Sequence, residues 1–260
     1  MVVQGAQVVS RVGLVLRIVS EHAPRGITTS ELARESGLTR PTAHRMLVSL
    51  ANEGFVDHDS LLGRWLLGPE LYLLGSIAAG RYDITEVAAP SVIGLARDTG
   101  ESAFLSARRG DETVCLTREE GSFPLRSFVL YPGVRFPLGV ASAGLAILSY
   151  LSDDEVRGYL ERRPLRQEWG DAHSPNAISQ RIEQTRRSGW GLNPGLILQG
   201  SYGMGAAVFD PAGKPAWALS ITGVESRFGP DRQPELGRLL LHYAHQVTQR
   251  LRPQGYLLVD

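Results

Sequence analysis

Residues 28–56 read TTSELARESGLTRPTAHRMLVSLANEGFV, and this stretch decides the fold of the first part of the chain. Thr28 followed by Glu31 is the capping-box pattern, in which each side chain accepts a hydrogen bond from the other residue's backbone amide. Gly37 predicts the end of this helix, because glycine readily takes the left-handed conformation found just past a helix. Thr39 predicts the N-cap of a second helix. The stretch therefore predicts two short helices joined by a tight turn.

The flanking segments extend this unit on both sides. Upstream, apolar residues at helical spacing predict a helix over about 8–21. Downstream, the β-prone runs 55–58 and 64–67 are separated by the turn-like DSLLG and predict a hairpin. Residues 69–81, PELYLLGSIAAGR, then predict a linking helix. Three helices followed by a hairpin is the order of a winged helix-turn-helix.

The second helix of the pair carries side chains suited to DNA. In a helix-turn-helix, this helix places its N-terminal residues against base edges, while the first helix braces the phosphate backbone. Its apolar side is expected to bury Ala43, Met46, Leu47 and Leu50. The residues that we assign to DNA contacts are Arg11, Thr28, Thr39, Arg40, Pro41, Thr42, His44, Arg45 and Arg64.

Two of these assignments lie outside the helix pair. Arg64, near the tip of the expected wing, is predicted to contact the minor groove or the backbone. Arg11 is either a phosphate contact or a solvated charge. The alternative for the whole stretch is a packed helical hairpin without a nucleic-acid role.

The overall charge does not favour a nucleic-acid partner. The chain has 27 basic and 27 acidic residues, so any DNA affinity must come from local placement of cations. Residues 37–52 meet this condition, because they contain Arg40, His44 and Arg45 and no acidic residue.

The bulk composition is that of a globular protein in the cytoplasm. A chain of 260 residues with 43% hydrophobic residues can bury a core in one large domain or two unequal ones. The longest apolar run, GVASAGLAIL at 139–148, is shorter than the roughly 20 residues of a membrane span. Arg11 and Arg17 interrupt the apolar N-terminus and argue against a signal peptide. A single cysteine, Cys115, allows no internal disulfide. We expect no metal and no cofactor.

From residue 83 onward, helices alternate with antiparallel hairpins. This pattern predicts an α+β domain with helices against a central sheet. Helices are expected at 85–99, 142–151, 153–162, 176–188 and 231–252, and strands at 102–108, 113–118, 205–209 and 216–222.

This second domain shows the residues of a ligand pocket. Ser220 and Thr222 alternate on one face of a strand, and Ser142 begins a helix that follows Gly139. The segments 193–195 and 200–203 are expected to expose backbone amides. Small hydroxyls and free amides in apolar surroundings suit a small polar or carboxylate ligand. Alternatively, the glycines only shape turns and the hydroxyls satisfy backbone groups.

Catalytic patterns are weak. G-x-S-x-G, the P-loop and G-x-G-x-x-G are absent. His242 and His245 are three residues apart on the last helix, but no third metal ligand accompanies them. We expect that the protein is not an enzyme. If it were one, turnover of a small molecule would depend on Ser142, Ser220 or His173.

Taken together, these motifs resemble the IclR family of bacterial transcriptional regulators over about residues 7–251. The most specific parts are ITTSELARESGLTRPTAHRMLVSLANEGFV, GRWLLGPELYLLG and FDPAGKPAWALSITG. The resemblance implies a winged helix-turn-helix domain (1–68), a linking helix (69–82) and a GAF-like α/β effector-binding domain (83–260). It also implies dimers, often paired as tetramers, on palindromic double-stranded operators, and a small-molecule effector, such as an aromatic compound or an organic acid. The alternative is a sensing module without direct DNA binding.

The resemblance places the effector site on Gly139, Ser142, Ala143, Asn193, Gly203, Met204, Ser220 and Thr222. Many members carry His-Cys-Thr-Ala-x-Gly-Lys where this chain has GVASAGL at 139–145. A pocket Asp of acid-binding members falls on Asn193, and a frequent Cys falls on Gly203. These departures predict a roomier, less polar cavity and an effector larger than a two- or three-carbon acid. Self-association is expected through the first and linking helices, at Leu14, Ile18, Leu71 and Leu74, and through the effector domains.

Overall fold

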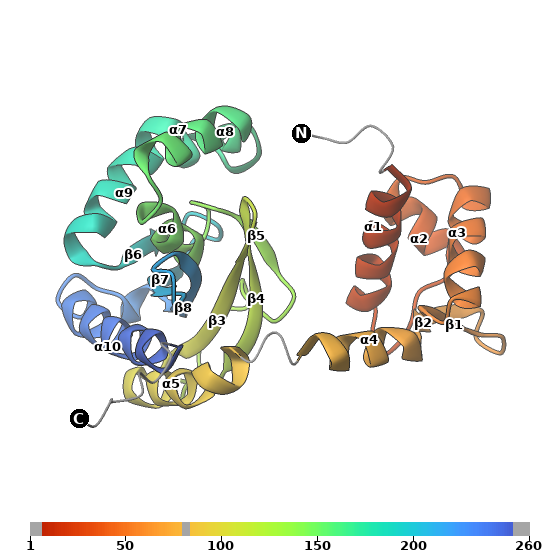
Figure 1. Ribbon diagram of the computed structural model, residues 1–260, viewed down its shortest axis with the longest axis horizontal. Helices are drawn as coiled ribbons and strands as arrows, with labels where there is room; N and C mark the ends of the chain where they lie inside the picture. Colours follow the sequence, from red (N-terminus) through yellow and green to blue (C-terminus); the bar gives the residue numbers. More distant parts are fainter. Residues whose placement is uncertain (1–6, 80–83, 252–260) are drawn as a thin grey trace, which may run out of the picture. The chain divides into compact units, whose positions relative to one another are not determined.

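The computed structural model describes residues 7–79 and 84–251, which form two compact units (Figure 1). The first unit begins with three helices, continues with a hairpin and ends with a helix. Its elements are α1 (Gln7–Glu21), α2 (Thr29–Ser36), α3 (Arg40–Asn52), β1 (Val56–Asp59), β2 (Arg64–Leu67) and α4 (Pro69–Ala79). This is the predicted winged helix-turn-helix order.

The capping box of α2 is confirmed. The Thr28 hydroxyl accepts a 3.2 Å hydrogen bond from the Glu31 amide, and the Glu31 carboxylate accepts one of 2.9 Å from the Thr28 amide. Gly37 ends the helix with φ 67°. Thr39 occupies the N-cap position of α3, but its side chain makes no cap bond, and its hydroxyl lies 2.9 Å from that of Thr42 instead. Thr39 is therefore the predicted N-cap residue, although its side chain does not supply a cap bond.

The core of the first unit joins all three helices to the hairpin. Val15, Leu32, Leu47, Val56 and Trp65 are buried together. The indole Nε1 of Trp65 donates a 3.0 Å hydrogen bond to Thr29 Oγ1, which fixes the wing against the start of α2.

Two sequence expectations about this core were wrong. Met46 is only partly buried, because α3 leaves it beside a surface groove. Ile18 is buried inside the core and cannot serve self-association, while Leu74 is exposed on α4.

The second unit is built on a six-stranded antiparallel sheet with the strand order β5-β4-β3-β8-β7-β6. Its strands are β3 (Ser102–Arg109), β4 (Glu112–Glu119), β5 (Arg135–Pro137), β6 (Gly191–Pro194), β7 (Ser201–Phe209) and β8 (Pro215–Val224). Its helices are α5 (Ile84–Thr99), α6 (Ser142–Ser149), α7 (Asp153–Arg162), α8 (Leu165–Trp169), α9 (Pro175–Ser188) and α10 (Gln233–Leu251), with short 3-10 turns at Asp171–His173 and Glu225–Arg227.

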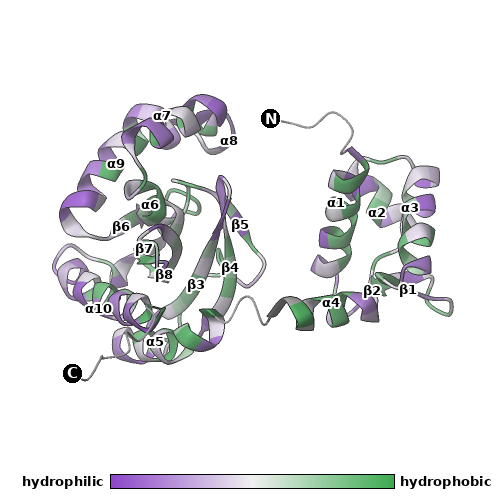
Figure 2. Cartoon of the chain, in the orientation of Figure 1, coloured by the Kyte–Doolittle hydropathy of each residue, from purple (hydrophilic) through white to green (hydrophobic). Residues whose placement is uncertain are grey.

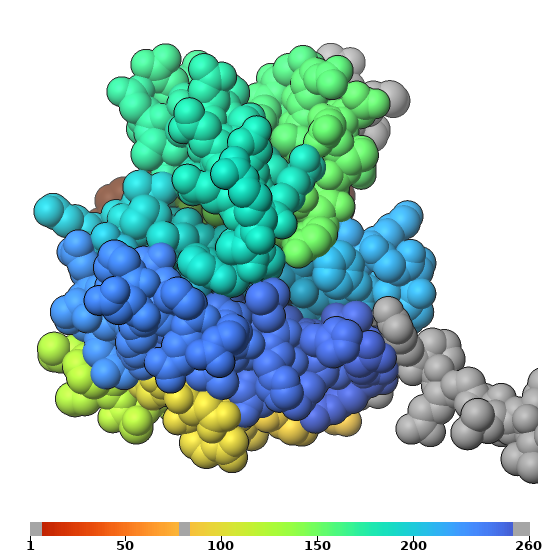
Figure 3. Space-filling model, turned by 90° about the vertical axis from the view of Figure 1, so that its left-hand side faces the viewer, coloured from red at the N-terminus to blue at the C-terminus, as the bar shows by residue number. Residues whose placement is uncertain are grey.

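Helices cover the two faces of this sheet differently. The helices α5 and α10 pack on one face and lie against each other (Figure 3). The helices α6 to α9 gather on the other face (Figure 1). Alternate residues of β3, β7 and β8 therefore enter two separate cores. None of the described helices is long and apolar enough to span a membrane.

Candidate DNA interface and effector cavity

The exposed start of α3 forms one side of a hollow. Arg40, Pro41, His44 and Arg45 line it together with Thr29 of α2. A neighbouring groove between α1 and α3 is lined in part by Arg11, Thr42 and Arg45. The structure therefore brings six of the predicted DNA-contacting residues onto adjoining parts of one surface.

Within residues 7–79 and 84–251, no acidic side chain pairs with the arginines of this surface. Across the described residues, Arg11, Arg40 and Arg45 have no acidic partner within ion-pair distance. An arginine that is exposed and unpaired can give its guanidinium donors to phosphate oxygens or to the major-groove edge of guanine.

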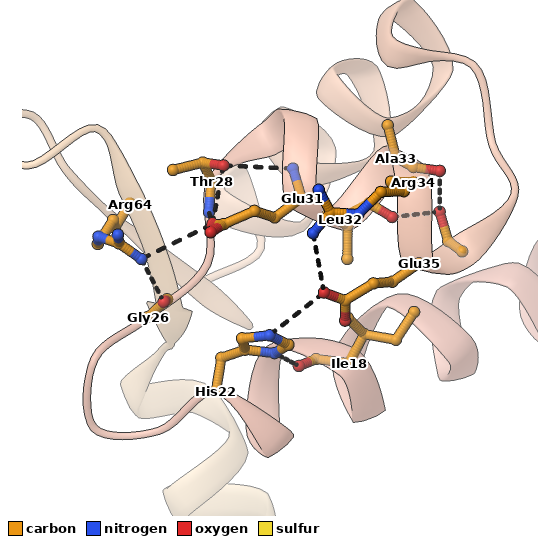
Figure 4. A network of polar contacts seen from close by, with 11 residues as sticks. Ile18, His22, Gly26, Thr28, Glu31, Leu32, Ala33, Arg34, Glu35 and Arg64 are labelled. Atoms are coloured by element: carbon orange, nitrogen blue, oxygen red, sulfur yellow. Dashed lines mark hydrogen bonds and ion pairs between the residues drawn. The ribbon is translucent and has the colours of Figure 1, made fainter.

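Arg64 differs from the sequence expectation. Its Nη1 donates a 2.9 Å hydrogen bond to the carbonyl oxygen of Gly26 and lies 3.7 Å from Glu31 Oε2 (Figure 4). The side chain turns back from the wing toward α2. The prediction that Arg64 is a wing cation free to contact DNA was therefore wrong. Thr28 is also engaged within the chain, because its hydroxyl belongs to the capping box.

On the helix-covered face of the second sheet lies a small cavity of about 30 Å³. Six of the predicted effector residues line it: Ser142, Ala143, Asn193, Gly203, Ser220 and Thr222. Apolar side chains from 129–136 and Ile197 complete its wall. None of the lining residues is Asp, Glu, His, Lys or Arg.

The hydroxyls of Ser220 and Thr222 are the most informative groups in this wall. Both oxygens are buried, and neither has a hydrogen-bond partner. Burying a hydroxyl without a partner costs about 1–3 kcal/mol, so such groups in a cavity wall point to a ligand or to water.

Two glycines opposite these hydroxyls let α6 approach the sheet. In the register of β7 and β8, Gly205 lies opposite Ser220 and Gly203 opposite Thr222. A Cβ at position 205 would lie only 2.7 Å from the Ser142 carbonyl, and one at 203 would lie 3.2 Å from Ser142 Oγ. The glycines therefore place the first turn of α6 at the cavity, where Ala141 provides no side-chain cap for its amides.

A family model described as the IclR helix-turn-helix domain matches residues 8–60, and one described as bacterial transcriptional regulator IclR C-terminal matches residues 77–249. The chain belongs to the IclR family. It is a transcriptional regulator with a helix-turn-helix DNA-binding domain and a C-terminal effector domain.

Individual IclR proteins are similar over most of their length. The regulator KipR of Bacillus subtilis is 29% identical over 231 residues, covering 88% of this chain and 91% of KipR. The repressor IclR of Escherichia coli is 27% identical, with coverage of 85% and 82%. A crystal structure of an IclR regulator from Alicyclobacillus acidocaldarius aligns with a TM-score of 0.76 at 25% identity, covering 94% and 98%. The crystal structure of an IclR homologue from Microbacterium hydrocarbonoxydans, complexed with 4-hydroxybenzoate, aligns with a TM-score of 0.73 at 22% identity, again covering 94% of this chain and 98% of the other.

Three details of the predicted IclR effector site were wrong. Asn193 lies in β6, not in a loop with exposed amides, and its side chain donates to Val140 O at 2.8 Å and accepts from the Leu196 amide at 2.9 Å. Met204 belongs to the opposite core with α5 and α10, because neighbouring strand residues face opposite sides. Gly139 does not line the cavity, and a Cβ there would contact Leu148 and Ile178.

Several lining residues were missed from the sequence. Ser106 lies in β3 and Thr113 in β4, and both are small hydroxyl residues within strands that the sequence had predicted, a signal that could have been noticed. Val129 and Leu130 belong to a segment without periodicity, and Ser127 in that segment contacts Ser201 through its hydroxyl.

The titratable side chains that a catalytic function would need, those of His173 and Cys115, do not line the cavity. His173 is buried with Nδ1 2.9 Å from Trp169 O and does not line the cavity with Ser142 and Ser220; burial lowers the pKa of His173. Burial raises the pKa of the Cys115 thiol to about 12. Within the described residues, no group of three His, Cys, Asp or Glu side chains could hold a metal ion.

Proposed function

We propose that this IclR-family regulator binds a palindromic operator as a dimer in the cytoplasm, and that an effector in the described cavity changes its affinity for that operator. The effector acts by binding one arrangement of the protein more tightly than another, which shifts their populations. The observation that carries the effector proposal is the pair of buried, unpartnered hydroxyls of Ser220 and Thr222 in the cavity wall.

On the DNA side, α3 is the reading helix. Arg40, His44 and Arg45 are its exposed contacts to base edges and phosphates, and Arg11 and Thr42 contact the backbone from the adjoining groove. The support is that these residues share one surface without internal acidic partners.

Self-association uses the linking helix. Tyr72, Leu73, Leu74 and Ile77 of α4 are exposed, and this helix is largely hydrophobic (Figure 2). Exposed apolar helix faces of this kind are typical of interfaces. A dimer would present two copies of α3 to successive half-sites, which a palindromic operator requires.

On the effector side, the cavity suits a molecule with an apolar body and a polar end. The polar end would meet Ser220, Thr222 and the first amides of α6, while the body would pack among Val129, Leu130 and Phe136. An aromatic acid or phenol matches this division into apolar and polar walls better than a two- or three-carbon acid does, and its binding requires the cavity of about 30 Å³ to widen. A distant relative of this fold holds 4-hydroxybenzoate, which is consistent with this class.

The DNA assignment is tested by fluorescence anisotropy with the intergenic DNA upstream of the protein's own coding sequence. We expect Arg40→Ala with Arg45→Ala to abolish specific binding without changing the melting temperature. Arg187→Ala is the matched control, since Arg187 is an exposed arginine of α9 in the other unit. Equal binding by the double variant and the wild type would refute the assignment and favour a sensing module without a DNA role.

The effector assignment is tested by thermal shift with 4-hydroxybenzoate, benzoate, glyoxylate and pyruvate. We expect the aromatic compounds to raise the melting temperature of the wild type and not that of Ser220→Ala with Thr222→Val. The largest shift from glyoxylate or pyruvate would show that the proposed effector class is wrong.

A further inference from the structure

The tip of the wing exposes two adjacent leucines. Leu61 is 95% exposed and Leu62 is 68% exposed, in the loop between β1 and β2. The loop is held in one shape, because Asp59 Oδ1 accepts hydrogen bonds from the amides of Leu61 (2.9 Å) and Leu62 (3.0 Å). Gly63, with φ 62°, completes the turn. The two side chains are therefore presented to the outside by an ordered turn.

The wing has no cation with which to bind a phosphate. The tip residues 60–63 are Ser, Leu, Leu and Gly, and Arg64 is turned back to Gly26 and Glu31. The exposed Asp57 on β1 would be repelled by the DNA backbone. Of the tip's side chains, only that of Ser60 can donate a hydrogen bond to a phosphate, so a contact between this tip and DNA would be mainly apolar.

The hairpin is fixed beside the reading helix. The ring of Trp65 in β2 lies 4.3 Å from that of His58 in β1 and 6.5 Å from that of His44 in α3. The tip begins two residues beyond this contact and projects clear of the helices (Figure 1). Trp65 thus holds the hairpin next to His44 of the reading helix.

We propose that Leu61 and Leu62 form an apolar wedge that enters the minor groove beside the site read by α3 and partly unstacks a base step. Leucine is among the side chains that minor-groove proteins insert in this way, and the resulting kink brings more DNA surface against the protein. The tip itself is small, and the carboxylate at its base, that of Asp59, is engaged by the amides of Leu61 and Leu62. The inference rests on operator binding by α3.

The test compares full-length wild type with Leu61→Ser/Leu62→Ser on operator DNA carrying 2-aminopurine at successive positions flanking the α3 site. We expect wild type to raise 2-aminopurine fluorescence at one step, as unstacking does, and the double variant to lose this rise. The variant should also bind about tenfold more weakly at every salt concentration with an unchanged salt slope, because no ionic contact is lost. Leu61→Met/Leu62→Met should restore both properties.

Two controls separate the possible failures. Leu198→Ser removes an exposed leucine from the second unit and should leave all readouts unchanged. Arg40→Ala/Arg45→Ala should lose specific binding, and its failure to do so would count against the reading helix and not the wedge. If the serine variant binds as tightly as wild type with the same fluorescence rise, the wedge is wrong. It is also wrong if the variant changes only the oligomeric state, which would assign the tip to a second copy of the chain.

Discussion

Arg64 of the wing donates a 2.9 Å hydrogen bond from Nη1 to the backbone carbonyl oxygen of Gly26. Gly26 lies two residues before Thr28, the N-cap of α2. Arg64 also lies 3.7 Å from Glu31 of the capping box, so two contacts of this side chain join the wing to the start of α2 (Figure 4). A residue that looks in sequence like a cation for DNA therefore holds the wing in place.

Replacing this tether should lower stability and leave the ionic part of DNA binding unchanged. We expect Arg64→Gln to reduce the free energy of unfolding by about 1 kcal/mol, since a partly exposed charged hydrogen bond is lost. Urea unfolding followed by tryptophan fluorescence measures this in a protein whose Trp169, Trp190 and Trp217 are replaced by Phe, so that Trp65 alone reports. A slope of log affinity against log salt that drops by about one, with no loss of stability, would instead return Arg64 to the DNA interface.

The capping box should make the first unit sensitive to acid. Hydrogen bonds from the Thr28 amide and hydroxyl, followed by the charges of Arg64 and Arg25, lower the pKa of Glu31 below its ordinary value of 4.5. A carboxylate with a lowered folded-state pKa stabilises the fold above 4.5 and loses this contribution as pH falls through the folded-state value.

Unfolding free energies of the wild type and Glu31→Gln should accordingly converge as pH falls from 6 to below 4.5. Glu53→Gln, at the exposed end of α3, serves as the control and should run parallel to the wild type. A constant difference between Glu31→Gln and wild type at all pH values would contradict the role of the ionised carboxylate.

Removing the two unpartnered hydroxyls should stabilise the free protein and abolish its response to effector. We expect Ser220→Ala or Thr222→Val to raise the free energy of unfolding by about 0.5–1 kcal/mol, because a buried group without a partner is removed. Ser149→Ala is the matched control: its buried hydroxyl donates a 2.7 Å hydrogen bond to Leu145 O, so its loss should not stabilise. Destabilisation by both cavity variants would mean that the hydroxyls have partners in solution.

Asn193 should not tolerate replacement by the corresponding acid. In Asn193→Asp, a buried carboxylate oxygen would face the Val140 carbonyl oxygen that Asn193 Nδ2 now binds. We expect a loss of at least about 2 kcal/mol at pH 7, and a smaller loss at acidic pH where the carboxyl is protonated. Asn176→Asp, in the exposed first turn of α9, should change little. Equal stability of Asn193→Asp and wild type at pH 7 would show that the hydrogen bond from Asn193 to Val140 O is dispensable.

Sequence reasoning worked where the determinants are local. The Thr28–Glu31 box and Gly37 lie within one helix, so their pattern alone predicts the observed caps. The alternation of Ser220 and Thr222 likewise predicts that both face one side of β8, whatever the strand pairs with.

The remaining features depend on contacts between distant residues. Arg64 and Gly26 are 38 positions apart, and nothing near Arg64 shows which way its side chain turns. Met204 was placed on the wrong face of the sheet, because neighbouring residues of a strand point to opposite faces. Only the pairing of β7 with β8 shows that Met204 faces away from the cavity. The short β6 was read as a loop because its last residue is Pro194, and proline is confined to edge strands such as this one.

The most direct measurement is the equilibrium affinity of the wild-type protein for its own upstream DNA and for unrelated DNA of equal length, over a salt series. The account predicts a saturable complex with the upstream DNA that survives excess competitor, with log affinity falling linearly against log salt. Equal affinity for both DNAs at every salt concentration, with and without the aromatic probes, would contradict it.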